Sequence, residues 1–238
     1  MSKKVLFLGA SGLIGPHITP GLESHCDLHL ADIKPHPDGV AVAHVDVTHY
    51  DEVHEAARDM DAIMNFTVVR GDSLQSFRVN TMGAWHVMRA AADLGITKVI
   101  HSGPQQVRRG YDWDFDIVDV PLSPNTGYYS CTKYLAGELC NTLARCHRIH
   151  TLSFVFNGLS AGPVESLKGE DIPPFRLHWE DLQHACRLAL DVASVPGYYQ
   201  ELNMHSFDIQ GKYSLAKARD ILGYEPTQRW DTFYKRSV

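Results

Sequence analysis

A short apolar run followed at once by three evenly spaced glycines, near the start of the chain, constrains the fold more than any other feature. Residues 5–8, Val-Leu-Phe-Leu, are too few for a helix and too uniformly apolar for a half-exposed strand, so they predict a buried parallel strand. Gly9, Gly12 and Gly15 follow at intervals of three, which suits a sharp turn, a close approach to the backbone and tight packing of the next helix. The start of that helix would offer free N–H groups and the positive end of its dipole to an anion.

A carboxylate at the end of the second predicted strand gives the glycine pattern a chemical meaning. Residues 27–31 predict that strand, and Asp32 ends it. A carboxylate at this position can accept both ribose hydroxyls of adenosine and repels a 2′-phosphate, so the pattern favours NAD over NADP. Simpler interpretations stay open, because a tight turn also needs glycines and an aspartate also opens the turn before Lys34-Pro35.

Strand-like and helix-like stretches alternate over the first hundred residues. Further strands are predicted at 41–45, 61–66 and 97–102, a short helix capped by Thr48, and a long helix at 73–94. This alternation predicts an α/β fold with a Rossmann-type doubly wound parallel sheet. Ligands then bind beyond the carboxyl ends of the strands. The positions that fall there are Gly9 to Gly15, Asp32, Asp46, Thr67 and Ser102.

Charge and composition argue against several classes of partner. A net charge of −6 provides no basic field to attract nucleic acid or an anionic membrane surface. No apolar run approaches the ~20 residues of a membrane span, and the N-terminus leads directly into a strand. The five cysteines lack C-x-x-C spacing, and the histidines lack metal-ligand spacing. We therefore expect a reduced, cytoplasmic protein without a bound metal.

A tyrosine and a lysine four residues apart carry the clearest chemical signal. Tyr129 and Lys133 lie near the start of a helix predicted at 128–147, so they share one face. A phenol with its ordinary pKa of ~10 is a poor acid-base catalyst near neutrality, but a nearby ammonium favours the phenolate. The lysine can also hold a ribose hydroxyl. A partly exposed helix pair would look the same in isolation, whereas the preceding dinucleotide pattern favours a catalytic role.

These motifs resemble an extended short-chain dehydrogenase/reductase of the NAD-dependent epimerase/dehydratase family. The resemblance covers nearly the whole chain, including stretches at 154–163, 177–181 and 214–226. Tyr129 and Lys133 match the catalytic pair, and Asn80 resembles an asparagine that supports the active-site lysine. The cofactor-binding residues implied by the resemblance are Gly9, Gly12, Leu13, Ile14, Gly15, Asp32, Asp46, Val47, Phe66, Thr67, Asn80, Ser102, Tyr129, Lys133 and Phe156.

One position departs from the family pattern. The family carries a serine or threonine after the fifth strand that hydrogen-bonds the substrate oxygen, and counting back from Val107 places Pro104 there. Proline has no side-chain donor, so another residue has to substitute. Ser102 is the candidate catalytic substitute, and Gln105 and Thr126 are candidate substrate-binding residues.

The chain is also shorter than typical members of the family. The resemblance implies a single domain of residues 1–238, with the NAD-binding core mainly at 1–163 and a small C-terminal substrate lobe at roughly 164–180 and 196–238. Compact members such as uronate dehydrogenases are similar in this respect. A small lobe favours a small sugar or sugar acid over a nucleotide sugar. Arg176 and Lys168 are candidates to hold a carboxylate, although each is equally plausible as a solvated charge.

The leading functional prediction is an NAD-dependent oxidoreductase that acts on a hydroxyl of a sugar-like substrate, with Tyr129 taking the hydroxyl proton. One alternative is an epimerase, which forms and reduces a ketone without net change in NAD. The other is an NAD-binding sensor or scaffold that has lost the chemistry, which Pro104 motivates.

A homodimer is implied by the same resemblance. The helices at 73–94 and 128–147 correspond to those that form a four-helix bundle between subunits in the family. Trp85, Met88 and Leu143 are candidates for that interface, and core packing explains such residues equally well. A further stripe of leucines at 135, 139 and 143 is expected to pack against the sheet.

Overall fold

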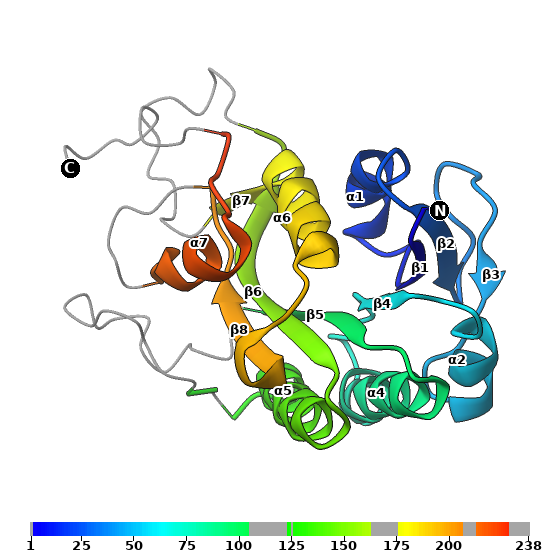
Figure 1. Cartoon of the computed structure of the whole chain (residues 1–238). Coiled ribbons are helices and arrows are strands. Elements are labelled where there is room, and N and C mark those ends of the chain that lie inside the picture. Colours follow the sequence, from blue (N-terminus) through cyan, green and yellow to red (C-terminus); the bar gives the residue numbers. More distant parts are fainter. Residues whose placement is uncertain (1, 105–122, 125, 163–175, 207–212, 229–238) are drawn as a thin grey trace.

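The computed structural model describes residues 2–104, 123–124, 126–162, 176–206 and 213–228 (Figure 1). Within these residues one parallel sheet has the strand order β3-β2-β1-β4-β5-β6-β7, and β8 also pairs with β6. The strands are β1 (Lys4–Leu8), β2 (Asp27–Asp32), β3 (Ala43–His44), β4 (Ala62–Asn65), β5 (Lys98–Pro104), β6 (His150–Ser160), β7 (Arg176–His178) and β8 (Tyr199–Asn203). The order confirms the predicted Rossmann-type doubly wound sheet.

Helices cover both faces of this sheet (Figure 1). They are α1 (Gly15–Leu22), α2 (Tyr50–Ala56), α3 (Ser73–Ser76), α4 (Gly83–Leu94), α5 (Tyr128–His147), α6 (Trp179–Asp191) and α7 (Ala216–Leu222), with a π-helical segment at Phe77–Met82 and a 3-10 turn at Pro196–Tyr198. No helix in the described ranges combines the length and the apolar character that a bilayer crossing needs.

The core has two layers because successive residues of a strand point to opposite faces. Phe7 of β1 and Met64 of β4 pack with α1, α6 and α7, whereas Leu6 and Ile63 pack with α2, α4 and α5. These strands are buried on both faces, as expected from the uniformly apolar run at 5–8.

The chain order reverses at β1, which pairs with β2 on one side and with β4 on the other. In open parallel sheets such a reversal opens a crevice beyond the carboxyl ends of the strands, because the connections leave in opposite directions. The turns after β1 and β4 both lie at this crevice, and the ends of β5 and β6 continue it.

The helix that follows β3 begins differently from the prediction. Its N-cap is His49 without a side-chain cap, so the predicted cap by Thr48 is wrong. The Asp46 carboxylate accepts a hydrogen bond from the Thr48 N–H at 2.9 Å, and the Glu52 carboxylate accepts one from the Asp46 N–H at 2.8 Å. Asp46 therefore forms the turn that leads into α2, and the helix starts later.

The leucine stripe of α5 is not its main buried face. Leu135 is exposed and Leu143 packs only partly against the core, whereas Ala136, Cys140 and Ala144 are buried, so the prediction is wrong for the stripe as a whole. Small side chains let α5 pack closely, and the same face also carries Lys133 into the interior.

The long helix predicted at 73–94 is interrupted by the π-helical segment, which carries Asn80. Met88 of α4 is fully buried, so core packing accounts for it, and it is not available to an interface. Leu74, Phe77, Met82 and Leu135 are exposed apolar residues on the two helices of the predicted dimer interface, which stays a prediction.

Candidate functional site

The turn after β1 is built from backbone constraints. Gly9 has φ +90, and a Cβ there would lie 2.8 Å from the Phe66 carbonyl carbon; a Cβ on Gly15 would lie 1.9 Å from the Ala10 carbonyl oxygen. The Gly12 N–H donates to the Gly9 carbonyl at 3.1 Å, which closes the turn. Glycine is required at the first and third positions, so the chain reaches α1 by the tight path that the spacing predicted.

Asp32 joins this turn to the end of β2. Its carboxylate accepts hydrogen bonds from the Ser11 N–H at 3.0 Å and from the Lys34 N–H at 3.1 Å. Two carboxylate oxygens offer about four acceptor positions, so acceptor capacity remains for hydroxyl groups of a ligand. Asp32 lines a cavity of about 260 Å³ together with Gly9, Gly12 and Asp46.

The far wall of this cavity is formed by Asp46 and Val47 after β3. The Val47 carbonyl lies 2.7 Å from the buried His86 Nδ1, and a Cβ on Gly83 would lie 2.8 Å from a Val47 methyl carbon. Helix α4 therefore holds Val47 in place. This cavity is lined by a glycine turn, a carboxylate at the end of a strand and an apolar wall. This combination of groups fits a dinucleotide.

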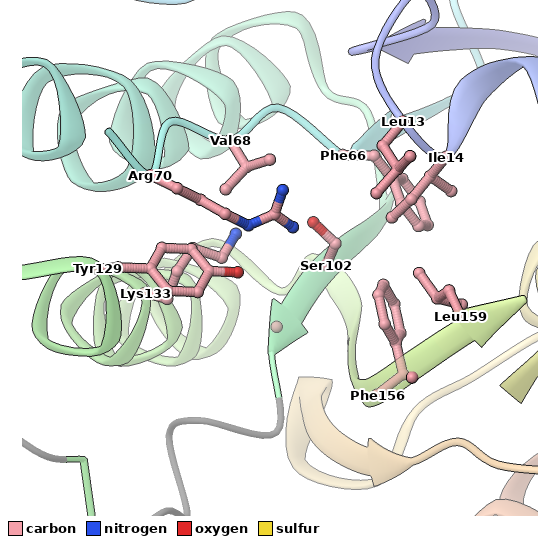
Figure 2. A pocket seen from close by; sticks show the side chains of 12 residues that line it. Leu13, Ile14, Phe66, Val68, Arg70, Ser102, Tyr129, Lys133, Phe156 and Leu159 are labelled. Atoms are coloured by element: carbon pink, nitrogen blue, oxygen red, sulfur yellow. The ribbon is translucent and has the colours of Figure 1, made fainter. Parts of the chain in front are cut away.

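A second cavity, of about 170 Å³, lies between α5 and the ends of β5 and β6 (Figure 2). Tyr129, Lys133 and Ser102 all line it, and Tyr129 and Lys133 point from α5 toward Ser102. Phe66 and Phe156 stack with ring centroids 6.4 Å apart at its opposite end. The two cavities share Leu13, Ile14, Phe66, Val68 and Arg70 as lining residues, so they adjoin.

Lys133 is the most perturbed group of this second cavity. Its side chain is buried, and Nζ has no hydrogen-bond partner in the described part of the chain. Burial lowers the pKa of Lys133 to about 8. Cys140 acts in the opposite direction, and the positive charge of Arg70 makes a smaller contribution that lowers the pKa. A buried amine without a partner is costly, so Nζ fits a hydroxyl acceptor from a bound ligand.

Asn80 links the π-helical segment to α5. Its Nδ2 donates to the Thr132 Oγ1 at 3.0 Å, and Thr132 precedes Lys133. Nδ2 also donates to the Val69 carbonyl and Oδ1 accepts from the Val69 N–H, both at 2.9 Å. Asn80 thus ties the segment after β4 to the helix that carries the lysine, and π-helical segments are frequent at such sites.

A family model agrees with this geometry. The model of the NAD dependent epimerase/dehydratase family matches residues 5–175. The chain belongs to this family. Its members use NAD as their cofactor, and the resemblance to this family that the sequence indicated is confirmed.

Known relatives are similar over most of their length. An uncharacterized protein of Bacillus subtilis (strain 168), YtbQ, is 31% identical over 94% of each chain. Glucuronic acid dehydrogenase from Chromohalobacter salexigens has a TM-score of 0.80 at 20% identity, covering 97% of this chain and 86% of that one. A UDP-galactose 4-epimerase has a TM-score of 0.76 at 15% identity, covering 97% and 96%. At these identities the two solved structures show the shared fold.

Most of the residues that the sequence suggested for substrate binding do not line either cavity or lie outside the described residues. Pro104 is the last residue of β5, where it pairs with Phe156. Thr126 is exposed and lies outside the linings of the two cavities, as does Arg176 at the start of β7. Gln105 and Lys168 lie outside the described residues.

Sequence reasoning missed Arg70, Val68 and Leu159, which also line the second cavity. Val68 and Arg70 follow β4 closely. Their position just after the carboxyl end of a strand next to the chain reversal could have indicated that they line the crevice. Leu159 lies in β6, within the stretch at 154–163 that resembles the family, but no motif residue there singled it out.

Proposed function

We propose that this protein oxidises a hydroxyl of a small sugar or sugar acid with NAD as the hydride acceptor. The observation that carries the proposal is the convergence of Tyr129 and Lys133 on Ser102 in a cavity that adjoins the glycine-lined cavity (Figure 2). Family membership supports NAD-dependent chemistry, and a structural neighbour described as a glucuronic acid dehydrogenase supports a sugar acid as substrate.

The cofactor would lie along both cavities. The glycine turn would hold the pyrophosphate, Asp32 the adenosine ribose, and Asp46 with Val47 the adenine. Phe66, Thr67 and Phe156 would bound the nicotinamide end. Bound NAD supplies the acceptor for the hydride, which leaves the alcohol carbon with its electron pair.

The chain's own residues manage the proton and the substrate oxygen. Tyr129 takes the hydroxyl proton while the carbon–oxygen double bond forms, so the products are a carbonyl compound, NADH and a proton. Lys133 holds a ribose hydroxyl, which gives its buried amine a partner. Ser102 donates to the substrate oxygen in place of the hydroxyl that Pro104 lacks.

Tyr129→Phe tests this assignment. A phenylalanine keeps the ring but removes the acid-base group, so we expect turnover to fall by roughly 10²- to 10⁴-fold. NADH formation at 340 nm measures turnover, and calorimetry measures NAD affinity, which should stay within about twofold. Tyr134→Phe, on the same helix, is the matched control, with unchanged turnover. Turnover that survives in Tyr129→Phe would reject Tyr129 as the base.

Net NADH formation also separates the alternatives. An epimerase would interconvert two sugar epimers without accumulating NADH, and a sensor would bind NAD without turnover. We infer in addition that the protein works in the cytoplasm as a homodimer. The exposed Phe77 and Leu135 on neighbouring helices support the homodimer.

A further inference from the structure

Arg70 reaches into the cavity that holds the catalytic pair, although no motif marked it. Its guanidinium carbon lies 5.3 Å from the centre of the Tyr129 ring. Figure 2 shows the guanidinium extended toward Ser102, next to the amine of Lys133 and the hydroxyl of Tyr129. Arg70 lines both cavities, so it stands where the cofactor region meets the reacting groups.

The backbone beneath Arg70 is held by three side chains. Asn80 bonds both the N–H and the carbonyl of Val69, and the Ser76 hydroxyl donates to the same carbonyl at 3.1 Å. The Tyr128 hydroxyl donates to the Arg70 carbonyl at 2.9 Å. The segment after β4 is therefore anchored to α3, to the π-helical segment and to α5, and this anchoring aims the arginine side chain at the cavity.

The charge of Arg70 is not neutralised by the described residues. None of the ion pairs formed within the described ranges includes Arg70. The closest acid in sequence, Asp72, accepts a hydrogen bond from the Gln75 N–H at 2.7 Å and caps α3. Lys133 lies close enough to Arg70 that the charge of Arg70 contributes to the lowered pKa of that lysine. Two cations thus lie together without an acidic partner among the residues that the structure describes, in a chain whose net charge is −6.

We propose that Arg70 binds a carboxylate of the substrate, attached one or two carbons from the hydroxyl that is oxidised. This inference rests on the proposed function, which brings the substrate to Tyr129. The planar guanidinium matches a carboxylate in a two-point contact, with nitrogen and oxygen atoms about 2.8 Å apart. The reacting oxygen must lie about 3 Å from the Tyr129 hydroxyl. Because Arg70 lies over the same ring, the two contacts leave room for only a short carbon link between them.

The substrate class is therefore a 2- or 3-hydroxy acid, of which sugar acids of the aldonic type are examples. Oxidation transfers the hydride from the alcohol carbon to NAD and the hydroxyl proton to Tyr129, which yields the corresponding oxo acid and NADH. The carboxylate stays unchanged throughout, because its role is recognition.

Arg70 also borders the cofactor region, so a phosphate of NAD is the competing anion. Replacing Arg70 distinguishes the substrate carboxylate from the NAD phosphate, because the two roles predict losses in different binding constants. An arginine that recognises the substrate changes the KM for the acid and leaves NAD affinity unchanged, whereas an arginine that binds a phosphate lowers NAD affinity for every substrate.

The experiment measures NADH formation by the NAD-saturated full chain with gluconate, glycerate and 3-hydroxybutyrate. Glucose and glycerol serve as uncharged counterparts, and 6-hydroxyhexanoate as an acid whose carboxylate is remote from the hydroxyl. We expect turnover with at least one of the three near acids and with none of the other compounds.

Arg70→Met and Arg70→Lys are compared with the parent, with Arg89→Met as control, because Arg89 is an outward arginine paired with Asp93 on α4. We expect Arg70→Met to raise the KM for the acid at least about tenfold, with a smaller change in kcat. Arg70→Lys should raise the KM less, because it keeps the positive charge. An unchanged KM in Arg70→Met would overturn the inference. So would a tenfold loss of NAD affinity without an effect specific to the acid, or no turnover with any of the three acids.

The proposed function fails by a different outcome. If the parent protein binds NAD and oxidises a neutral sugar but no acid, the oxidoreductase assignment stands and the role of Arg70 falls. If calorimetry detects no NAD binding, the oxidoreductase assignment falls first, and the inference about Arg70 falls with it.

Discussion

On the β1 side of the crevice the backbone itself forms the ligand surface, whereas on the β5 side long side chains from separate elements form it. Gly9 and Gly15 shape the first side through a positive φ at Gly9 and contacts that a Cβ at either position would not fit. Tyr129, Lys133 and Arg70 shape the second side from α5 and from the segment after β4. The first surface is rigid and local in sequence, and the second depends on how distant elements pack.

Substitution at Gly15 should break the first side most severely. In Gly15→Ala the new Cβ would lie 1.9 Å from the Ala10 carbonyl oxygen, so the backbone must shift. We expect a loss of about 3 kcal/mol or more in the free energy of unfolding, measured by urea denaturation. Gly71→Ala is the matched control, because nothing lies within 4 Å of its added Cβ. Equal stability of the two variants would show that the turn tolerates a side chain.

Substitution at Lys133 should sharpen the contrast by stabilising the second side. Its pKa in the folded protein is lowered to about 8, mainly by burial, whereas the unfolded chain protonates the group up to about pH 10.4. The folded state therefore carries the full cost of the buried charge below pH 8. This cost disappears as the pH rises toward 10.4, because only the unfolded state then binds the proton.

The free energy of unfolding of Lys133→Met should thus be about 3 kcal/mol larger than that of the parent at pH 7. This gain in stability should vanish near pH 10.5. Denaturation of the cofactor-free protein at several pH values measures it. The exposed Lys217→Met variant is the control and should show no such trend. A gain independent of pH would mean that packing, and not the charge, is responsible.

Substitution at Asp32 should have the smallest effect. Asp32→Ala removes the acceptor at the end of β2 and also its hydrogen bonds with Ser11 and Lys34. We expect NAD to bind about tenfold more weakly, with a smaller loss or a gain for NADP, since the repulsion of a 2′-phosphate is removed. Calorimetry with both nucleotides measures the ratio. Asp38→Ala, an exposed acid on the same connection, should leave the ratio unchanged.

Predictions from the sequence were most accurate where a local backbone constraint determines the residue. The glycine spacing, Asp32 and the four-residue interval of Tyr129 and Lys133 each follow from the geometry of one turn or one helix. The predicted cap at Thr48 failed because Thr48 lies in the turn that the Asp46 carboxylate forms and the helix begins after His49, a choice of boundary that the pattern could not decide. The placement of the family's serine position at Pro104 stays a prediction, and Ser102 lines the cavity from β5.

Predictions were weakest where the packing distance between helices and sheet decides which side chains are buried. The leucines of α5 indicated the buried face, but close approach of α5 to the sheet selects Ala136, Cys140 and Ala144. Arg70 could not be found from its neighbours, because its direction depends on Asn80 and Tyr128 from other elements. Such residues acquire their surroundings only when segments far apart in the chain meet.

The sequence by itself determined the parallel sheet, the glycine turn and the placement of Tyr129 and Lys133 on one face of a helix, because strand burial, positive φ and helical spacing are properties of a few adjacent residues. Only the tertiary structure decided which helix face is buried, that the lysine amine is isolated from partners within the described chain, and that a second cation stands beside it. Burial and the meeting of charges depend on contacts between distant segments, and these contacts exist only in the folded chain.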